Sequence, residues 1–253
     1  MTPALFANIL QPITDVAESM IKFFQSDVGM SWGLAIVALT FAVRLLVLPL
    51  SLRGIRSMRH MQVIAPEMKA IQERYKDDKE RQQREMLRLY KENKVNPLAS
   101  CFPFLLQIPF FIAIYQLLRG DSFTADVEQS GASEGFLFVA SVIEKPQGLE
   151  TGILIVLFIS TTVLSFLYTT ATTQTASGAQ KYIFLALPVL FAPLIVSQPA
   201  GLAIYWITTN VWSLGQQVVV QRLIPAPTPE QQEAVSVAAR PPPPPPRKKK
   251  RRR

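Results

Sequence analysis

Hydrophobic residues in this chain fall into long blocks, and charged residues lie almost entirely between the blocks. About 20 apolar residues are enough for one crossing, because a helix rises ~1.5 Å per residue and the hydrocarbon core is ~30 Å thick. Blocks of roughly this length cover residues 31–52, 98–118, 152–168, 182–198 and 202–221. The pattern predicts an all-α, polytopic membrane protein with five transmembrane helices.

The segment ahead of the first block, residues 1–30, has a weaker pattern. Apolar residues at spacings of three and four predict one face of a helix; they are Phe6, Ile9, Ile13, Val16, Met20 and Phe23. We expect Pro12 to break this helix near its start. An extracytoplasmic amphipathic helix lying on the membrane is the preferred interpretation, and a disordered leader is the alternative. A cleaved signal peptide is disfavoured, because Asp15 and Glu18 interrupt any apolar core and no basic residues precede it.

The first connection, residues 53–96, carries 12 Lys/Arg and 7 Asp/Glu. Pro66 favours the start of one helix, and Asp77 and Asp78 favour a turn and the N-cap of a second. The expected apolar faces are Met61, Ile64, Met68, Ile71 and Tyr75 in the first helix, and Met86, Leu87 and Tyr90 in the second. Glu80–Arg84 and Arg81–Glu85 have the spacing of helical ion pairs. This predicts a helical hairpin outside the membrane, with a solvated linker as the alternative.

The other connections are simpler. Residues 119–150 are expected to form a polar loop, residues 169–181 a short link, and Pro199 to Gly201 a tight turn. Residues 224–253 end in PPPPPPRKKKRRR. Because consecutive bases repel each other and cannot pack in a core, this tail is predicted to be disordered.

Basic residues also predict the orientation. The hairpin has 12 Lys/Arg and residues 222–253 have nine, whereas residues 119–150 have two and only Lys22 precedes the first block. Positive charge stays on the cytoplasmic side of short connections. The sequence therefore predicts a protein of the cell (plasma, or inner) membrane, with its N-terminus outside and its C-terminus in the cytoplasm.

Arg44 is the only charged residue within the five blocks. An ionised Arg near the middle of a bilayer costs roughly 2.5–3.5 kcal/mol on insertion scales. The side chain could reach the nearer interface by snorkelling. The preferred interpretation is that Arg44 faces water or a polar groove inside the membrane, because mostly apolar residues continue for two turns beyond it.

Several kinds of chemistry are disfavoured. The chain has one Cys and one His, which cannot form the usual Cys/His metal sites. The blocks hold no Asp or Glu, although ion-coupled transporters usually need intramembrane carboxylates. We therefore expect no catalytic residues, no metal and no cofactor, and the chain is not predicted to be an enzyme. A small-molecule transporter and a membrane-anchored nucleic-acid binder, suggested by the basic tail, remain as rival classes.

Uncharged polar residues within the blocks could line a wet groove, or could simply join helices. The candidates are Thr40, Gln107, Gln116, Thr161, Thr162, Thr208, Thr209, Asn210, Gln216 and Gln217.

Four stretches carry a family resemblance: LTFAVRLLVLPL, ERYKDDKERQQREMLRLYKENKVNPLASCFPFLLQIPFF, LPVLF and AGLAIYWITTNVWSLGQQ. They resemble the YidC/Oxa/Alb membrane protein insertase family, in its short bacterial form, over about residues 32–217. The resemblance implies an insertase core, residues 31–223, whose five helices surround a hydrophilic groove open to the cytoplasm and to lipid. The large outer domain and extra first helix of Gram-negative members are expected to be absent.

The resemblance also implies site residues. Arg44 matches the groove arginine, Thr40 a polar position one turn before it, and Trp206, beside Tyr205, the substrate-contacting aromatic position. Tyr168 stands where the family often has a glutamine, so no groove glutamine is carried over. Gln107, Tyr168, Thr208 and Asn210 are the further candidates for groove lining.

The implied function is that of a membrane protein insertase and chaperone, which assists protein translocation into the membrane. It would accept nascent membrane proteins and release their hydrophobic segments into the lipid bilayer, alone or with the Sec translocon. Basic tails in the resembling family bind ribosomes, so Arg247 to Arg253 are expected to bind the ribosome, with acidic lipid as the competitor. The signal-recognition-particle receptor is a further candidate partner.

Overall fold

The computed structural model describes residues 3–93, 95, 102–130, 134–173, 179–223, 228 and 230. Its regular elements in these ranges are helices, apart from one isolated bridge between Phe136 and Val139. The predicted all-α class is therefore confirmed. The chain divides into two compact units, one comprising residues 1–58 and 98–226 and the other residues 59–97 and 227–253.

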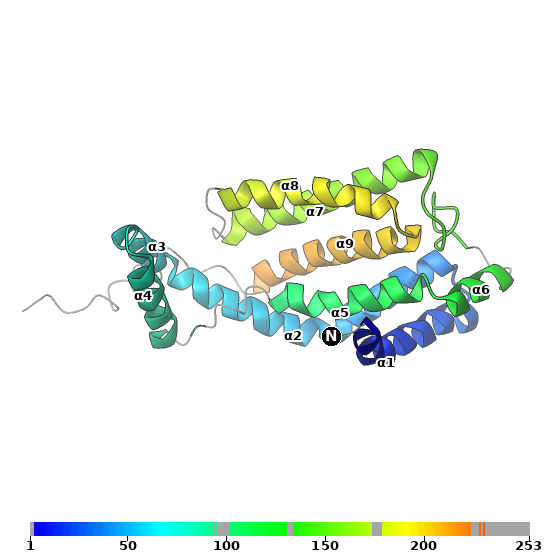
Figure 1. Cartoon of the computed structure of the whole chain (residues 1–253), viewed down its shortest axis with the longest axis horizontal. Coiled ribbons are helices and arrows are strands. Elements are labelled where there is room, and N and C mark those ends of the chain that lie inside the picture. Colours follow the sequence, from blue (N-terminus) through cyan, green and yellow to red (C-terminus); the bar gives the residue numbers. More distant parts are fainter. Residues whose placement is uncertain are drawn as a thin grey trace, which may run out of the picture. The chain divides into compact units, whose positions relative to one another are not determined.

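The larger unit holds most of the helices (Figure 1). They are α1 (Pro3–Lys22), the π-helix η1 (Phe23–Asp27), most of α2 (Trp32–Val63), α5 (Phe102–Leu117), α6 (Asp121–Gln129), α7 (Gly148–Thr173), α8 (Ala179–Val196) and α9 (Ala200–Leu223). Helix α7 packs against both α8 and α9, and α1 packs along α5. The smaller unit contains α3 (Ala65–Arg74) and α4 (Lys79–Glu92).

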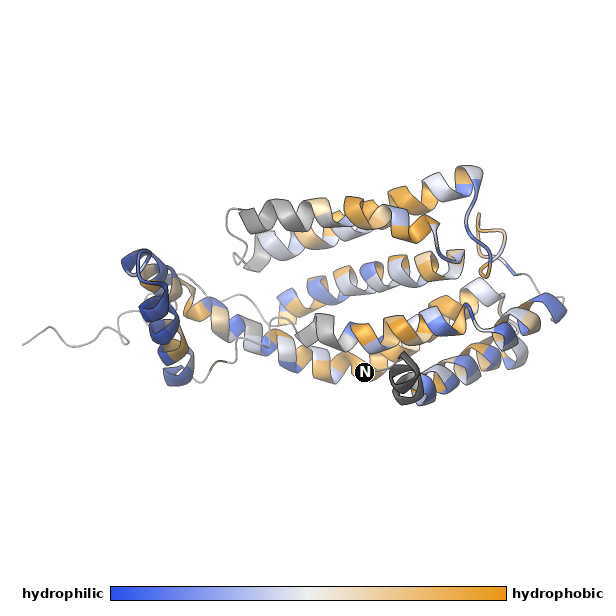
Figure 2. Ribbon diagram, viewed as in Figure 1, coloured by the Kyte–Doolittle hydropathy of each residue, from blue (hydrophilic) through white to orange (hydrophobic). Residues whose placement is uncertain are grey.

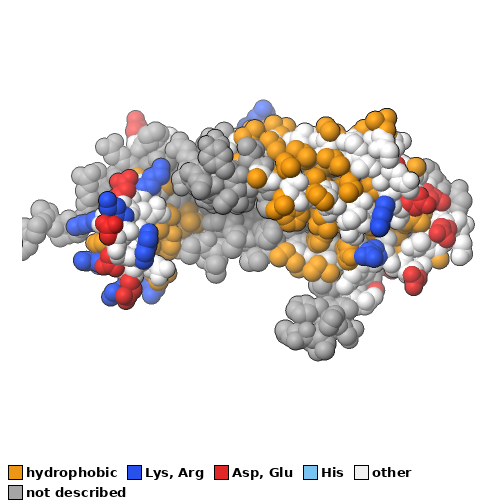
Figure 3. Space-filling view, turned by 45° about the horizontal axis from the view of Figure 1, so that its top comes forward, with side chains coloured by type: hydrophobic (Ala, Val, Ile, Leu, Met, Phe, Trp, Pro, Cys, Tyr) orange, Lys and Arg blue, Asp and Glu red, His pale blue; other side chains and the backbone are white. Residues whose placement is uncertain are grey.

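The larger unit is apolar inside and over much of its surface. Trp32, Ile36 and Leu39 of α2 belong to a buried cluster to which α1, α5, α6, α7 and α9 also contribute. Large apolar side chains such as Val156 and Leu190 are exposed. Much of the ribbon of this unit is orange in Figure 2, and Figure 3 shows hydrophobic side chains over much of its surface, whereas charged side chains gather over the smaller unit. Such a surface suits lipid rather than water.

Among the described residues, α2 and the stretch Gly148–Thr170 of α7 are long and apolar enough to cross a membrane, and Gln107–Leu117 is a shorter apolar helix. The predicted number of five spans therefore stays a prediction.

Several helices extend beyond the predicted spans and connections. Helix α2 continues past the predicted span 31–52 to Val63, because no proline interrupts the chain between Pro49 and Pro66. The link predicted over residues 169–181 is helical at both ends, since α7 continues to Thr173 and α8 begins at Ala179. Helix α1 runs through Pro12 without ending there. The tight turn near Pro199 is confirmed, because α8 ends at Val196 and α9 begins at Ala200.

The predicted polar loop, residues 119–150, contains helix α6. Gly120 is its N-cap residue and Asp121 lies in its first turn, where an acidic side chain interacts favourably with the helix dipole. Phe123 and Val127, four residues apart, are buried. Phe123 meets Trp32 edge-to-face at 5.2 Å between ring centroids, so packing against α2 stabilises a helix that is short on its own.

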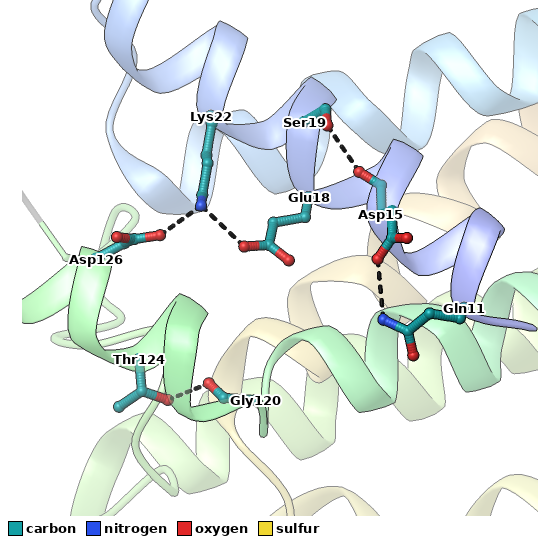
Figure 4. Close-up of polar contacts among 8 residues, drawn as sticks. All are labelled: Gln11, Asp15, Glu18, Ser19, Lys22, Gly120, Thr124 and Asp126. Atoms are coloured by element: carbon teal, nitrogen blue, oxygen red, sulfur yellow. Dashed lines mark hydrogen bonds and ion pairs between the residues drawn. The ribbon is translucent and has the colours of Figure 1, made fainter. Parts of the chain in front are cut away.

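Polar contacts hold α1 against α6 and α5. The Lys22 Nζ lies 2.8 Å from a carboxylate oxygen of Glu18 and 2.6 Å from one of Asp126 (Figure 4). These two carboxylates raise the pKa of Lys22, the Asp126 hydrogen bond being the larger cause. The Thr14 hydroxyl donates to Gln116 Oε1 at 3.3 Å. The N-terminal segment is thus helical, as preferred over a disordered leader, and its position on a membrane surface stays a prediction.

The face of α1 that packs inside the protein only partly overlaps the predicted apolar stripe. Thr14, Ala17 and Ile21 are buried, and Met20 of the stripe packs against the buried cluster. Val16 and Phe23 of the stripe are more than half exposed, so that they stay free for the membrane contact predicted for this stripe.

The smaller unit forms the predicted helical hairpin. Pro66 lies in the first turn of α3, and the Asp78 side chain caps α4 by accepting from the Arg81 amide at 3.0 Å. The Glu80–Arg84 pair forms at 3.1 Å, but Arg81 lies over the Tyr75 ring, 5.0 Å from its centroid, instead of pairing with Glu85.

The hairpin has a small core of its own. Ile64, Leu89 and Val95 are buried, and partly buried side chains pack on them: Met61, Met68, Ile71 and Tyr90. The prediction that Leu87 belongs to the apolar face is wrong, because its side chain is 56% exposed and Leu89 is buried instead.

Glu67 is expected to destabilise the hairpin when it is ionised. Burial and, secondly, the charge of Glu92 raise the pKa of Glu67 above its ordinary 4.5. Its Oε1 is buried without a hydrogen-bond partner among the described residues. Because the pKa of Glu67 is raised in the folded state, its ionisation destabilises the hairpin at neutral pH. This destabilisation disappears as pH falls below 4.5. We predict that Glu67→Gln slows amide hydrogen exchange in α3 and α4 at pH 7 but not at pH 4. An equal effect at both pH values would contradict this cause.

Candidate functional site

The larger unit contains a cavity of about 300 Å³ between α1, α2 and α5, which Tyr205 of α9 also reaches. Most of its lining side chains are apolar. They are Pro12, Ile13, Val16, Ala17 and Met20 from α1, Leu39, Val43, Leu46 and Val47 from α2, and Phe110, Ala113 and Ile114 from α5. The polar lining residues are Thr40, Arg44, Ser51, Gln107 and Tyr205. The cavity is therefore a chamber with apolar walls and a small polar group of side chains.

Arg44 is the centre of that polar group. Its Nη2 donates to Gln107 Oε1 at 2.6 Å, and Gln107 Nε2 donates to the Tyr205 hydroxyl. Side chains from α2, α5 and α9 are thus joined in one chain of hydrogen bonds. The Arg44 guanidinium is directed toward α5, where its hydrogen-bond partner Gln107 lies.

The charge of Arg44 is not neutralised inside the cavity. None of the described residues that line the cavity is Asp or Glu, so Gln107 compensates the guanidinium only through a dipole. In surroundings of low dielectric constant an uncompensated cation attracts anions strongly. The site can therefore bind a carboxylate next to apolar side chains.

Thr40 lies one turn before Arg44, as predicted, and lines the same cavity. It is buried, and its hydroxyl donates to the Ile36 carbonyl oxygen at 2.7 Å. A hydroxyl that donates to its own helix still has acceptor capacity. Thr40 can thus accept a hydrogen bond from a ligand while it stays in the lining.

Trp206 is placed elsewhere. Its ring stacks on Phe111 of α5 at 5.1 Å and lies 5.6 Å from Phe158 of α7. The residue is not part of the cavity lining, so the structure separates it from its neighbour Tyr205. The aromatic contacts instead join α9 to α5 and α7.

The remaining candidates lie on the α7 and α9 helices, away from the cavity lining. Asn210 Nδ2 donates to Thr162 Oγ1 at 2.7 Å, and the Tyr168 hydroxyl donates to Gln221 Oε1 at 2.7 Å. Thr208 is buried on α9. The Thr169 hydroxyl also donates to Gln217 Oε1 at 2.8 Å. These hydrogen bonds match the alternative that polar residues in membrane helices join the helices to one another.

Sequence reasoning missed the wall that α1 contributes. The apolar residues of α1 suggested a helix on the membrane surface, yet Ala17 and Met20 line the cavity. No sequence signal distinguishes a helix that lies on the membrane surface from one that packs against other helices, because both arrangements use one apolar face. The described residues also contain no group of three or more His, Cys, Asp or Glu side chains that could hold a metal ion.

The known proteins that this chain resembles point to one family. Residues 23–227 match the family model described as 60Kd inner membrane protein. The chain is 38% identical over 245 residues to a membrane protein insertase YidC of Streptomyces avermitilis, covering 84% of this chain and 56% of that protein. For the YidC of Francisella tularensis subsp. novicida the values are 36% over 215 residues, 85% and 37%. The chain thus spans about half or less of the length of these relatives.

A solved structure is also similar. It is described as an active YidC insertase crystal structure with the first transmembrane domain resolved. The similarity has a TM-score of 0.59 and 27% sequence identity, and covers 83% of this chain and 45% of that one.

Proposed function

Since the chain belongs to the 60Kd inner membrane protein family, we propose that it is a membrane protein insertase. It is a multi-pass protein of the plasma membrane. The proposed substrates are nascent membrane proteins, whose hydrophobic segments it releases into the bilayer. The activity is chaperone-like and involves no bond chemistry.

The observation that carries this proposal is the lone cation in an apolar chamber. Arg44, held by Gln107, attracts an acidic residue in the short outer segment of an incoming protein, because the surroundings have a low dielectric constant. Polar side chains beside Arg44 lower the cost of bringing polar backbone partway across the membrane. Transfer of the hydrophobic segment from the chamber into lipid then drives insertion, aided by the membrane potential.

The proposed topology uses α2, α5, α7, α8 and α9 as the five spans. The basic hairpin and the C-terminus would lie in the cytoplasm and α6 outside, following the charge distribution of the connections. Residues 12–20 of α1, which line the Arg44 cavity, would lie within the membrane beside α5. Trp206 is proposed to contact substrate only after its stack with Phe111 opens.

Reconstitution tests the proposal. The purified chain is placed in liposomes, and a single-span protein with a short acidic outer segment is synthesised in their presence. Protection of that segment from added protease is expected with the protein and not with empty liposomes. A flux assay for ions and small solutes on the same liposomes covers the transporter alternative. Protection equal to that of empty liposomes would reject the insertase function.

The partners are proposals as well. The hairpin is proposed to receive substrate and to contact the Sec translocon or the signal-recognition-particle receptor. Arg247 to Arg253, which lie outside the described residues, are proposed to bind ribosomal RNA. We predict that ribosomes co-sediment with the detergent-solubilised protein in low salt, that binding falls steeply as salt rises, and that removal of these seven residues weakens it. Equal recovery without them would leave acidic lipid as the surface they bind.

A further inference from the structure

A short apolar loop between α6 and α7 is not used by the proposed mechanism. Residues 135–143 contain no charged residue, and Glu134 and Glu144 flank them. The backbones of Phe136 and Val139 bond to each other at 2.9 Å in both directions, which makes a tight turn. Leu137 is at the tip of this turn with φ +54° and is 84% exposed, and Phe138 beside it is also exposed.

The base of the loop is fixed to the ends of membrane helices. The amides of Ala200 and Gly201, the first residues of α9, donate to the carbonyl oxygens of Glu144 at 2.7 Å and Val142 at 2.9 Å. Gly33, at the start of α2, lies so close to Phe136 that a Cβ on it would be 2.1 Å from the Phe136 Cβ. The loop therefore lies at the level where α2 and α9 begin.

The tip is unfavourable in water for two separate reasons. A positive φ is strained for a residue with a Cβ, and glycine or asparagine would adopt it more readily than leucine. An exposed leucine and phenylalanine also leave apolar surface in contact with water. Because an asparagine would relieve both, the leucine indicates surroundings that are not aqueous.

We propose that this loop tip, Leu137 and Phe138, inserts into the bilayer at the leaflet where α2 and α9 begin. The fixed base sets the depth of the tip close to the membrane interface, the region that amphipathic surface elements occupy. Two side chains offer far less area than the roughly 800 Å² per partner of a stable protein interface. The loop has no charged group for a polar ligand, so lipid is the partner that fits.

A second exposed leucine agrees with this position. Leu149, at the start of α7, is 80% exposed. The loop precedes α7 directly in the chain, and Figure 2 shows its apolar residues between α6 and α7. The inference depends on membrane residence and not on the proposed insertase function.

Spin labelling of the full chain in liposomes tests the proposal. The single cysteine, Cys101, is replaced by serine, and Leu137→Cys carries a nitroxide label. The matched control is Glu128→Cys on α6, an exposed charged position. We expect the label at position 137 to be relaxed more by oxygen, which concentrates in lipid, than by a water-soluble nickel complex, with the ratio several-fold higher than at position 128.

Two outcomes would overturn the proposal. A ratio equal to that of the control means that the tip is in water, and shielding from both relaxers means that protein covers it. A second measurement needs no substitution at the tip. The unmodified chain in liposomes that contain a diazirine lipid should be labelled, by mass spectrometry, within residues 135–143, and absence of label there would equally reject lipid contact.

Discussion

Replacing Arg44 by alanine is expected to abolish most insertion of substrates whose outer segments are acidic. The variant removes the only charge among the described residues of the cavity lining. Hydrogen bonds to charged groups contribute about 1.5–3 kcal/mol, which corresponds to a loss of roughly tenfold or more. Arg44→Lys should retain much of the activity, because the positive charge stays within reach of the chamber. Protease protection in liposomes measures the effect.

The control for Arg44 separates charge from folding. A substrate with an uncharged outer segment should be inserted almost equally by the alanine variant and the unchanged protein. The alanine variant should also be as heat-stable or more so, since an ionised Arg in the membrane costs roughly 2.5–3.5 kcal/mol. Full activity of Arg44→Ala on acidic substrates would refute the role of the cation.

Deleting the hairpin, Pro66 to Asn93, is expected to reduce insertion to the level of protein-free liposomes. The hairpin has its own apolar core of Ile64, Leu89 and Val95, and the helices of the larger unit pack around a separate cluster. The larger unit should therefore fold without the hairpin. Thermal unfolding of the deletion variant, measured beside the insertion assay, checks that it does.

Point substitutions in α4 make the same test without removing chain. Leu89 is 6% exposed and Leu87 is 56% exposed. Leu89→Ala should destabilise the hairpin by about 2–5 kcal/mol, the usual cost of truncating a buried leucine. Leu87→Ala should change stability by less than about 0.5 kcal/mol. If an ordered hairpin is needed, insertion falls only in the Leu89 variant, and equal activity of both would show that the hairpin is a linker.

Helix starts and caps were predicted correctly from the sequence, because they depend on residues close together in the chain. The Asp78 cap and the Pro66 start of the hairpin helices were predicted because capping residues act on amides within a few positions. Helix α6 was missed, because its two large apolar residues, Phe123 and Val127, are too few to mark a helix without the partner they pack on.

The candidate site was predicted in part. Arg44 was found from sequence because a charge among apolar residues is expensive wherever the helix lies. The polar residues of α7 and α9 were ambiguous, because an amide or hydroxyl in a membrane helix either lines a groove or joins two helices. Asn210 is bonded to Thr162 and so joins α9 to α7, whereas Gln107 both joins α5 to α2 through Arg44 and lines the cavity.

The sequence by itself determined the helical class, the membrane residence and the lone charge, since these follow from composition and spacing along one chain. Only the tertiary structure decided that α1 closes one side of the Arg44 cavity, that Tyr205 faces the cavity while Trp206 stacks on Phe111, and that Leu137 stands exposed on a turn fixed to α9. The physical reason is that these features depend on residues far apart in the sequence. Packing, and not local preference, sets their distances.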